Sequence, residues 1–280
     1  MSGSLDAVAI RCMDVAFTYP GGTRALDGVD LEIRVGERVA IVGQNGSGKS
    51  TLVRQFNGLL HPDAGQVEVL GVPTAGRHVA ELARDVGLAF QNPDRQIFAG
   101  RVGREVEFGP RNIGRSGPEL AAAVDAALES VGLDGMASVN PYDLGFSRRK
   151  LLAIASILAM RTPIVILDEP TTGQDARSVE RVQRIVTELG DAGRTVVAIS
   201  HDLRFVATTF DRVVVMREGH VVLDGPPEVV FAEASWPLLA SAALEPPFPA
   251  RVGVAANVGP TPTLPSLIRA LSGDADSPSG

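Results

Sequence analysis

The sequence predicts an α/β fold with a parallel core sheet, an N-terminal antiparallel β subdomain and an inserted helical subdomain. Five short runs of β-branched and apolar residues have the composition of buried strands, at 38–42, 86–90, 163–167, 195–200 and 212–216. These runs are continuously apolar, which is typical of parallel strands covered on both faces. Helical patterns alternate with the strands, at 49–60, 118–133, 147–160 and 176–193. Such alternation predicts a layered α/β domain.

Two stretches inside the main domain, which we place at residues 8–228, depart from this alternation. Residues 5–36 alternate polar and apolar positions, and we expect antiparallel strands there. Residues 92–161 place helical patterns next to one another with no strand between them, so we expect a helical insert.

The composition of the chain changes after the main domain. Ten of the 19 prolines occur from Pro226 onward. We assign 229–272 to a C-terminal extension, in which the amphipathic pattern at 264–271 predicts a short helix. That helix either dimerises the protein or covers its own core. The polar end at 273–280 predicts a disordered tail.

Composition excludes several classes of protein. The formal net charge is −7, which disfavours a nucleic-acid partner that needs a basic face. The only cysteine, Cys12, cannot form an internal disulfide, and this fits a reducing compartment. The N-terminal residues lack a basic segment followed by an apolar block, so we expect no signal peptide. No apolar run approaches the ~18 residues that a transmembrane helix needs.

A phosphate-binding motif follows the first parallel strand. Residues 43–50 fit the pattern G-x-x-x-x-G-K-[ST], between a predicted strand and a predicted helix, which is the context that this motif requires. Glycines let backbone N–H groups wrap phosphate oxygens, and the helix N-terminus adds positive potential. Lysine occurs only at Lys49 and Lys150, whereas arginine is used elsewhere. A compact ammonium group at Lys49 can reach nucleotide phosphates, and the hydroxyl of Ser50 can bind Mg²⁺.

These residues predict a P-loop NTPase with a RecA-like core sheet. The nucleotide-binding residues expected from the motif are Gly43, Asn45, Gly46, Ser47, Gly48, Lys49, Ser50 and Thr51.

Polar side chains also follow the other strands of the predicted sheet. Asp168 ends a buried strand, where a carboxylate is placed for Mg²⁺, and the adjacent Glu169 can act as a general base on water. Gln91 and His201 follow two further strands, and parallel sheets deliver such residues to one crevice. Taken singly, a Gln in this position is usually a turn residue and a His is as often structural as functional.

With these strand ends in place, the chain resembles the ATP-binding cassette (ABC) ATPases from about residue 8 to 228. Residues 43–51 match the Walker A motif, 164–169 the Walker B motif with its glutamate, and Gln91 the Q-loop. The resemblance implies that Tyr19 stacks on adenine, that Asp175 belongs to the D-loop and that His201 is the switch histidine. It implies hydrolysis of ATP with Mg²⁺, in which Glu169, His201, Lys49 and Gln91 are catalytic, and Ser50, Gln91 and Asp168 are near the metal.

A narrower resemblance is to the energy-coupling-factor ATPases of vitamin and transition-metal uptake systems. It rests on residues 90–112, on 155–175 and on the tail from 243. It implies a prokaryotic ATPase on the cytoplasmic face of the membrane, below a transmembrane coupling subunit that holds a substrate-capture membrane protein. We expect the acidic Asp94, Glu105 and Glu107 to meet arginines of that coupling subunit, or else to form a solvated acidic face.

The chain departs from the family at the signature motif L-S-G-G-Q. Residues 144–148 contribute to the nucleotide site of an opposite subunit in the family, but here they read Leu-Gly-Phe-Ser-Arg. Either this signature is degenerate, or Ser147 replaces the missing hydroxyl and Arg148 or Arg149 supplies charge. A third alternative is that Ser147 only caps a helix. For the signature contacts we name Gly145, Ser147 and Arg148.

The chain keeps Lys49, Glu169 and His201, which would act with the signature of an opposite subunit, whereas its own signature is altered. This combination favours a heterodimer, in which a second ATPase subunit supplies the usual signature, over a homodimer. The D-loop departs as well, because Gln174 stands where an apolar residue is common in the family.

Two other classes of function compete with transport. A soluble ABC ATPase acting on nucleic acid or ribosomes usually carries long coiled-coil inserts or tandem cassettes, and this chain has neither. A P-loop GTPase or kinase is the other class, but the guanine-selecting N-K-x-D motif is missing from this sequence, and such proteins lack a switch histidine after the fourth strand. The sequence therefore favours an ATPase subunit of an uptake transporter, and it does not name the cargo.

Overall fold

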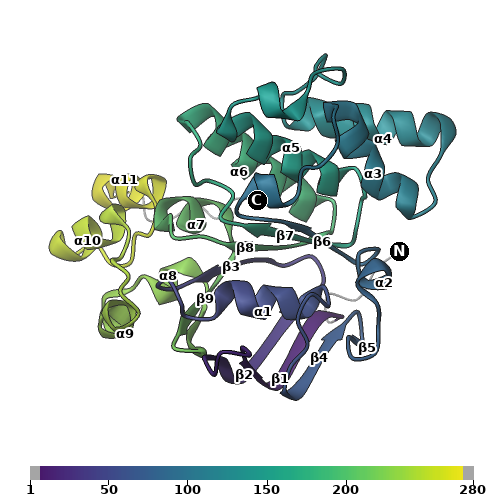
Figure 1. Cartoon of the computed structure of the whole chain (residues 1–280). Coiled ribbons are helices and arrows are strands. Elements are labelled where there is room, and N and C mark those ends of the chain that lie inside the picture. The colour runs from purple at the N-terminus through teal and green to yellow at the C-terminus, as the bar shows by residue number, and fades with distance from the viewer. Residues whose placement is uncertain (1–6, 274–280) are drawn as a thin grey trace.

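Two sheets and a layer of helices form the core of the computed structural model, which describes residues 7–273 (Figure 1). The larger sheet has six strands in the order β10-β9-β3-β8-β7-β6. Its members are β3 (Arg38–Val42), β6 (Val86–Ala89), β7 (Ile164–Asp168), β8 (Thr195–Ile199), β9 (Arg212–Arg217) and β10 (His220–Gly225). All neighbours in it are parallel except β10, which runs antiparallel to β9.

The smaller sheet is antiparallel and has the order β2-β1-β4-β5. It consists of β1 (Val8–Thr18), β2 (Arg24–Arg34), β4 (Ala64–Val69) and β5 (Val72–Pro73). The predicted fold class is confirmed: a parallel core sheet, an antiparallel β unit and a group of helices inserted between β6 and β7. Each of the five predicted core strands is present, with ends that agree within one residue.

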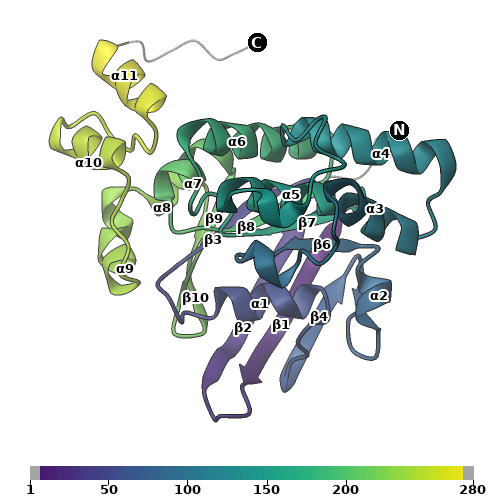
Figure 2. The ribbon, with the colours of Figure 1, turned by 45° about the horizontal axis from the view of Figure 1, so that its top comes forward.

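The helices cover both faces of the parallel sheet (Figures 1 and 2). Helix α1 (Lys49–Phe56) lies between the two sheets, and α2 (Val79–Leu82) lies beyond β5. The opposite face is covered by α3 (Val102–Asn112), α4 (Gly117–Ser130), α5 (Phe146–Leu158), α6 (Ala176–Asp191) and α7 (Leu203–Thr209). The first three of these form the helical group between β6 and β7.

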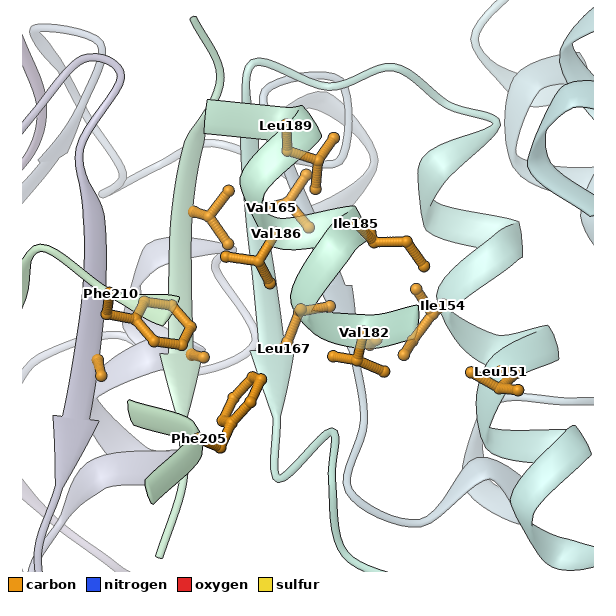
Figure 3. Packing of buried hydrophobic residues seen from close by; sticks show 14 of the residues in the cluster. Leu151, Ile154, Val165, Leu167, Val182, Ile185, Val186, Leu189, Phe205 and Phe210 are labelled. Atoms are coloured by element: carbon orange, nitrogen blue, oxygen red, sulfur yellow. The ribbon is translucent and has the colours of Figure 1, made fainter. Parts of the chain in front are cut away.

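The parallel strands are buried on both faces, and this explains why their sequences do not alternate. In β3, Val39 and Ile41 pack toward the antiparallel sheet, whereas Ala40 and Val42 pack toward the helices. On the helical side, α6 lays Val182, Ile185, Val186 and Leu189 on Val165 and Leu167 of β7 (Figure 3). The sheet is therefore held between two hydrophobic cores, which fixes its position relative to both neighbouring layers.

The C-terminal extension leaves the core after β10 as a series of short helices, seen at one side of the molecule in Figure 2. They are α8 (Pro227–Val230), α9 (Trp236–Ser241), α10 (Phe248–Ala255) and α11 (Leu264–Ser272). The helix predicted at 264–271 is thus present. Leu267 of α11 is buried, whereas Leu264, Ile268 and Leu271 are more than half exposed. The predicted disordered tail lies outside the described residues, apart from Gly273, which ends α11.

No helix within residues 7–273 is both long enough and apolar enough to cross a bilayer. This agrees with the absence of a long apolar run from the sequence.

One buried polar side chain in α1 predicts a stabilising substitution. Gln55 is fully buried, and within the described part of the chain neither its Oε1 nor its Nε2 has a hydrogen-bond partner. Replacing an unsatisfied buried amide by an apolar side chain of similar shape removes a desolvation penalty of about 1–3 kcal/mol. We expect Gln55→Leu to raise the free energy of unfolding, measured by urea denaturation. The paired variant Gln55→Glu, which buries a charge, should lower it, and a Leu variant less stable than the wild type would contradict this reading.

Candidate active site

The carboxyl ends of four adjacent parallel strands lie at one edge of the large sheet. Ile41 of β3 pairs with Ile199 of β8, and Ile199 pairs with Asp168 of β7. On the other side of β7, Leu167 pairs with Ala89 of β6. The segments that follow these strands carry the phosphate-binding loop, His201, Glu169 and Gln91. Residues far apart in the sequence are therefore neighbours at this edge.

The phosphate-binding loop between β3 and α1 requires glycine at two positions. Gly43 has φ 149°, and a Cβ there would lie 2.2 Å from the carbonyl oxygen of Met216 in β9. Gly48, the N-cap of α1, has φ 100°, and a Cβ there would lie 2.4 Å from the carbonyl oxygen of Ala25. Both glycines therefore allow the loop to pack against neighbouring backbone, which holds the N-terminus of α1 toward the sheet edge.

Lys49 is buried beneath this loop. Its Nζ donates to the carbonyl oxygens of Gly43 at 2.7 Å and Gln44 at 2.8 Å. Burial lowers the pKa of Lys49, and the nearby carboxylates of Glu169 and Asp168 oppose that shift. The ammonium group is thus held inside the loop, within the field of two acidic residues.

Asp168 has the properties of a metal ligand. Its side chain is buried, and its Oδ1 has no hydrogen-bond partner within residues 7–273. Burial and the neighbouring Glu169 raise its pKa, whereas Arg54, Ser50 and Lys150 favour the ionised form. An orphaned carboxylate oxygen beside the Ser50 hydroxyl fits Mg²⁺, which commonly takes one or two carboxylates and completes its shell with phosphates and water.

The described residues contain no cluster of three or more His, Cys, Asp or Glu side chains that holds a metal alone.

Glu169 adopts a backbone conformation that is rare for its residue type. Its φ is 51°, in the left-handed region, although the residue is not a glycine. Its N–H donates to the Ile199 carbonyl at 2.9 Å, and its Oε2 lies 2.7 Å from Nδ1 of His201. Non-glycine residues in this region cost about 1–3 kcal/mol and persist where surrounding contacts over-determine them. The conformation turns the carboxylate toward His201 and the cavity at the sheet edge.

A cavity of about 230 Å³ lies at this edge. Tyr19 lines it, with its hydroxyl 3.0 Å from Thr51 Oγ1, and so do Gln91, Asp168 and Glu169. From the phosphate-binding loop the cavity is lined by Asn45, Gly46, Ser47, Gly48, Lys49, Ser50 and Thr51. Gly43, the first residue of the loop, and His201 are not among the described residues that line the cavity, and His201 contacts the site through Glu169. Thr23, Arg24, Ala25 and Ile199 also line the cavity, and the sequence motifs did not identify them.

Comparison with known proteins identifies the family to which the chain belongs. A family model described as ABC transporter matches residues 26–172, more than half of the chain. The chain belongs to the ABC transporter family. It is 38% identical over 226 residues to the energy-coupling factor transporter ATP-binding protein EcfA of Methanocaldococcus jannaschii, a match that covers 80% of this chain and 81% of the relative. It is thus an ABC-type ATPase, and the predicted resemblance to the energy-coupling-factor proteins is confirmed.

Two further matches are also ABC transporter proteins. An ABC transporter ATP-binding protein of Caldanaerobacter subterraneus is 44% identical over 226 residues, which is 81% of this chain. The match spans only 40% of that longer relative. Among solved structures, CbiO1 from Clostridium perfringens, described as part of the ABC transporter complex CbiONQ, superposes with a TM-score of 0.74 at 34% identity. That superposition covers 90% of this chain and 100% of CbiO1.

The altered signature of this ABC ATPase lies outside the cavity, at the start of α5. Gly145 is the N-cap of the helix, so the reading of Ser147 as its cap is wrong. The Ser147 hydroxyl instead donates to Oε1 of Gln174 at 2.5 Å. Arg149 donates to the Leu144 carbonyl, whereas Arg148 is exposed. Among the residues named for the signature contacts, Gly145, Ser147 and Arg148, only Arg148 has a long side chain, and it is exposed.

Asp175 of the D-loop is also outside the cavity. Its Oδ1 accepts from the N–H of Ser178 at 2.8 Å, and it forms the N-cap of α6. The hydrogen bonds from Ser178 lower the pKa of Asp175. In this chain the residue therefore starts a helix.

Lys150 and Thr172 are residues of the site that the motifs missed. Lys150 Nζ donates to the Thr172 carbonyl at 3.0 Å, and Thr172 Oγ1 donates to Glu169 Oε2 at 3.3 Å. The sequence did carry a signal for Lys150, because it is the second of two lysines in a chain that otherwise uses arginine.

The buried ammonium group of Lys150 predicts a dependence of stability on pH. Burial lowers its pKa from 10.5 to about 8, against the opposing pull of Glu169 and Asp168. Between about pH 8 and 10.5 the unfolded chain therefore binds more protons than the folded chain, so stability rises with pH in that window. We expect the free energy of unfolding of the wild type to rise relative to Lys150→Met, by at most about 3 kcal/mol. Urea denaturation across the window measures this difference, and parallel curves for the two proteins would contradict it.

Proposed function

We propose that this chain is the ATP-hydrolysing subunit of an energy-coupling-factor importer for a vitamin or a transition-metal ion. The observation that carries the proposal is the convergence of Lys49, Asp168, Glu169 and Gln91 on one cavity at the sheet edge. Support for the transporter class comes from the relatives EcfA and CbiO1, whose names place them in transporter complexes. We infer that the chain sits at the cytoplasmic face of a prokaryotic cell membrane, bound to membrane subunits.

The roles of the residues follow from their positions. The backbone N–H groups of the phosphate-binding loop and the ammonium group of Lys49 bind the phosphates, and Tyr19 provides an aromatic face for adenine. Glu169 orients and deprotonates the attacking water, and His201, 2.7 Å from it, holds that carboxylate. Gln91 closes the cavity from the end of β6. In this proposal these contacts would hold the attacking water and the γ-phosphate in line, and positioning is the main source of catalysis in phosphoryl transfer.

Ser50 and Asp168 would hold Mg²⁺, with Gln91 facing the same space. When bound, this ion neutralises charge on the phosphate oxygens. Burial and the neighbouring Glu169 raise the pKa of Asp168, and a bound cation would favour its ionised form.

A second cavity is suited to the transmembrane partner. It measures about 880 Å³ and lies among α2, β6, α3 and α5. Three phenylalanines line it, Phe90, Phe98 and Phe108. Two of them are exposed, Phe98 at 59% and Phe108 at 50%, with ring centroids 4.7 Å apart. Exposed aromatic side chains in a groove are typical of helix-binding sites. We infer that a cytoplasmic helix of the transmembrane coupling subunit docks there, beside the segment that begins with Gln91.

The acidic residues proposed to meet that subunit have partners inside the chain. Glu105 is buried and accepts from the N–H groups of Phe98 and Ala99, so it shapes the groove from below. Glu107 pairs with Arg111 at 2.7 Å, and Asp94 pairs with Arg149 at 3.0 Å. Glu105 is therefore less accessible to a partner's arginine than Asp94 and Glu107, and its contact with a partner stays a prediction. A partner's arginine would have to replace an existing pair at Asp94 or Glu107.

We also infer that the chain works with a second, different ATPase subunit. In the family, each nucleotide-binding site is completed by the signature of the opposite cassette. Here the Ser147 hydroxyl already donates a hydrogen bond to Gln174 of the same chain. The apolar face of α11 formed by Leu264, Ile268 and Leu271 is exposed and suits the contact between subunits. A substrate-capture membrane protein would complete the importer, and no part of the proposal requires nucleic acid.

The role of Glu169 predicts a separation of binding from hydrolysis. Glu169→Gln keeps the size of the side chain but removes the base, so phosphate release from this chain's own site should fall on the order of a thousandfold. Binding of a fluorescent ATP analogue with Mg²⁺ should be unchanged. The exposed Glu180 on α6 provides a control, and Glu180→Gln should keep full activity. Hydrolysis by Glu169→Gln at the wild-type rate would show that another group activates the water.

The heterodimer proposal predicts the mass of the same variant in solution. Because Glu169→Gln binds ATP without hydrolysing it, it should trap any closed dimer. We expect purified Glu169→Gln to remain a monomer with Mg-ATP in light scattering. An ATP-dependent homodimer would show that residues 144–148 can close on a γ-phosphate, and the preference for a heterodimer would then be wrong.

A further inference from the structure

Two of the positions at which this chain departs from its family, Ser147 and Gln174, contact each other. Ser147, at the altered signature, donates its hydroxyl to Oε1 of Gln174 at 2.5 Å. Gln174, the unusual residue of the D-loop, donates Nε2 to the backbone carbonyl of Ser147 at 3.2 Å. The amide therefore uses both its acceptor and its donor on one residue. Neither an apolar residue at 174 nor a glycine at 147 can make this reciprocal pair.

Two further contacts flank the pair and complete what we call the clasp, formed by Phe146, Ser147 and Lys150 on residues 172–174. The Phe146 ring lies over Gly173, so close that a Cβ at Gly173 would be 2.9 Å from its Cε1. Lys150 Nζ donates to the Thr172 carbonyl at 3.0 Å and lies 5.9 Å from the centroid of the Phe146 ring. The first turn of α5 thus contacts three consecutive residues after β7.

The turn that the clasp holds also carries Glu169. The Thr172 N–H donates to the Glu169 carbonyl at 3.3 Å, and Thr172 Oγ1 donates to Glu169 Oε2 at 3.3 Å. The Gln174 N–H closes the turn on the Thr171 carbonyl at 3.1 Å. Because Glu169 has a left-handed backbone, its orientation depends on contacts that keep this turn in place.

We infer that Gln174 is a positioning residue for ATP hydrolysis, which through Ser147 holds the turn of Glu169 against the first turn of α5. The inference rests on the proposed role of Glu169. It has a second consequence for the signature. The Ser147 hydroxyl serves the chain's own hydrolytic site, so it is not a ligand for the nucleotide of an opposite cassette. The altered signature and the altered D-loop are then one feature, in which each substitution requires the other.

A double-mutant cycle between Ser147→Ala and Gln174→Met tests this inference. Methionine keeps the length of the glutamine side chain and removes both hydrogen bonds. The variants are compared in the transporter complex isolated through a tag on this chain, as kcat and KM for ATP. The activity that persists in Glu169→Gln is subtracted, so that only hydrolysis by this chain is compared.

We expect Gln174→Met to lower kcat about tenfold, with KM unchanged, as the loss of about 1.4 kcal/mol of positioning would do. Ser147→Ala should lower kcat less, and it should have no further effect when Gln174 is already Met. Gln174→Glu keeps an acceptor for the Ser147 hydroxyl and should restore part of kcat. The matched control is Gln183→Met on the surface of α6. It removes the hydrogen bond from Gln183 to the Thr208 hydroxyl of α7 and should leave kcat unchanged.

Three outcomes would overturn the inference. Gln174→Met with wild-type kcat would show that the clasp does not position Glu169. Additive losses from the two single variants would show that Ser147 acts independently of Gln174. A drop in the activity remaining in Glu169→Gln, when Ser147→Ala is added, would show that this hydroxyl serves an opposite cassette. Failure of the proposed function itself would be distinct, because Glu169→Gln would then hydrolyse ATP at the wild-type rate.

Discussion

The parallel register of β6, β7, β8 and β3 is the constraint on which the site depends. Ile41, Ile199 and Asp168 stand level with one another, and hydrogen bonds continue past the strand ends from Ser200 to Ile41 and from Glu169 to Ile199. In a parallel sheet all carboxyl ends lie at one edge. The segments that follow these strands therefore bring the phosphate-binding loop, Gln91, Asp168, Glu169 and His201 to the same edge. A slip of one residue in β7 would exchange the buried faces of that strand and turn Asp168 away from the cavity.

Burial on both faces makes this register rigid and sets the electrostatics of the site. Lys49, Lys150, Asp168 and Glu169 are all buried, and three of them, Lys49, Asp168 and Glu169, line the cavity at the sheet edge. Burial lowers the pKa of both lysines and raises that of Asp168, and the opposite charges work against these shifts. The lysines and the carboxylates thus favour each other's ionised forms, whereas Glu169 disfavours the ionised form of Asp168. An added phosphate group enters a site that already holds charges of both signs.

The chain is asymmetric in a way that fits a partnership with another cassette. Its own phosphate-binding loop, Asp168, Glu169 and His201 are assembled, whereas the turn at 144–148 is bound to residues 172–174 of the same chain. That arrangement strengthens the link between α5 and the turn of Glu169. It also changes what the chain presents outward, because the exposed group is then the guanidinium of Arg148 and not a serine hydroxyl.

The sequence by itself determined the fold class, the core strands and the phosphate-binding loop, because each depends on local patterns. Continuous apolar runs mark strands buried on both faces, and the glycines at Gly43 and Gly48 permit backbone angles that other residues reach only with strain. Their position at the end of a buried strand also predicted Asp168 and Glu169 as site residues. Only the tertiary structure decided the contact of Ser147 with Gln174, the link from Lys150 to Thr172 and the burial of Glu105. Contacts between α5 and the turn after β7 join residues separated by more than twenty positions, and no local periodicity encodes which side chain meets which across that distance.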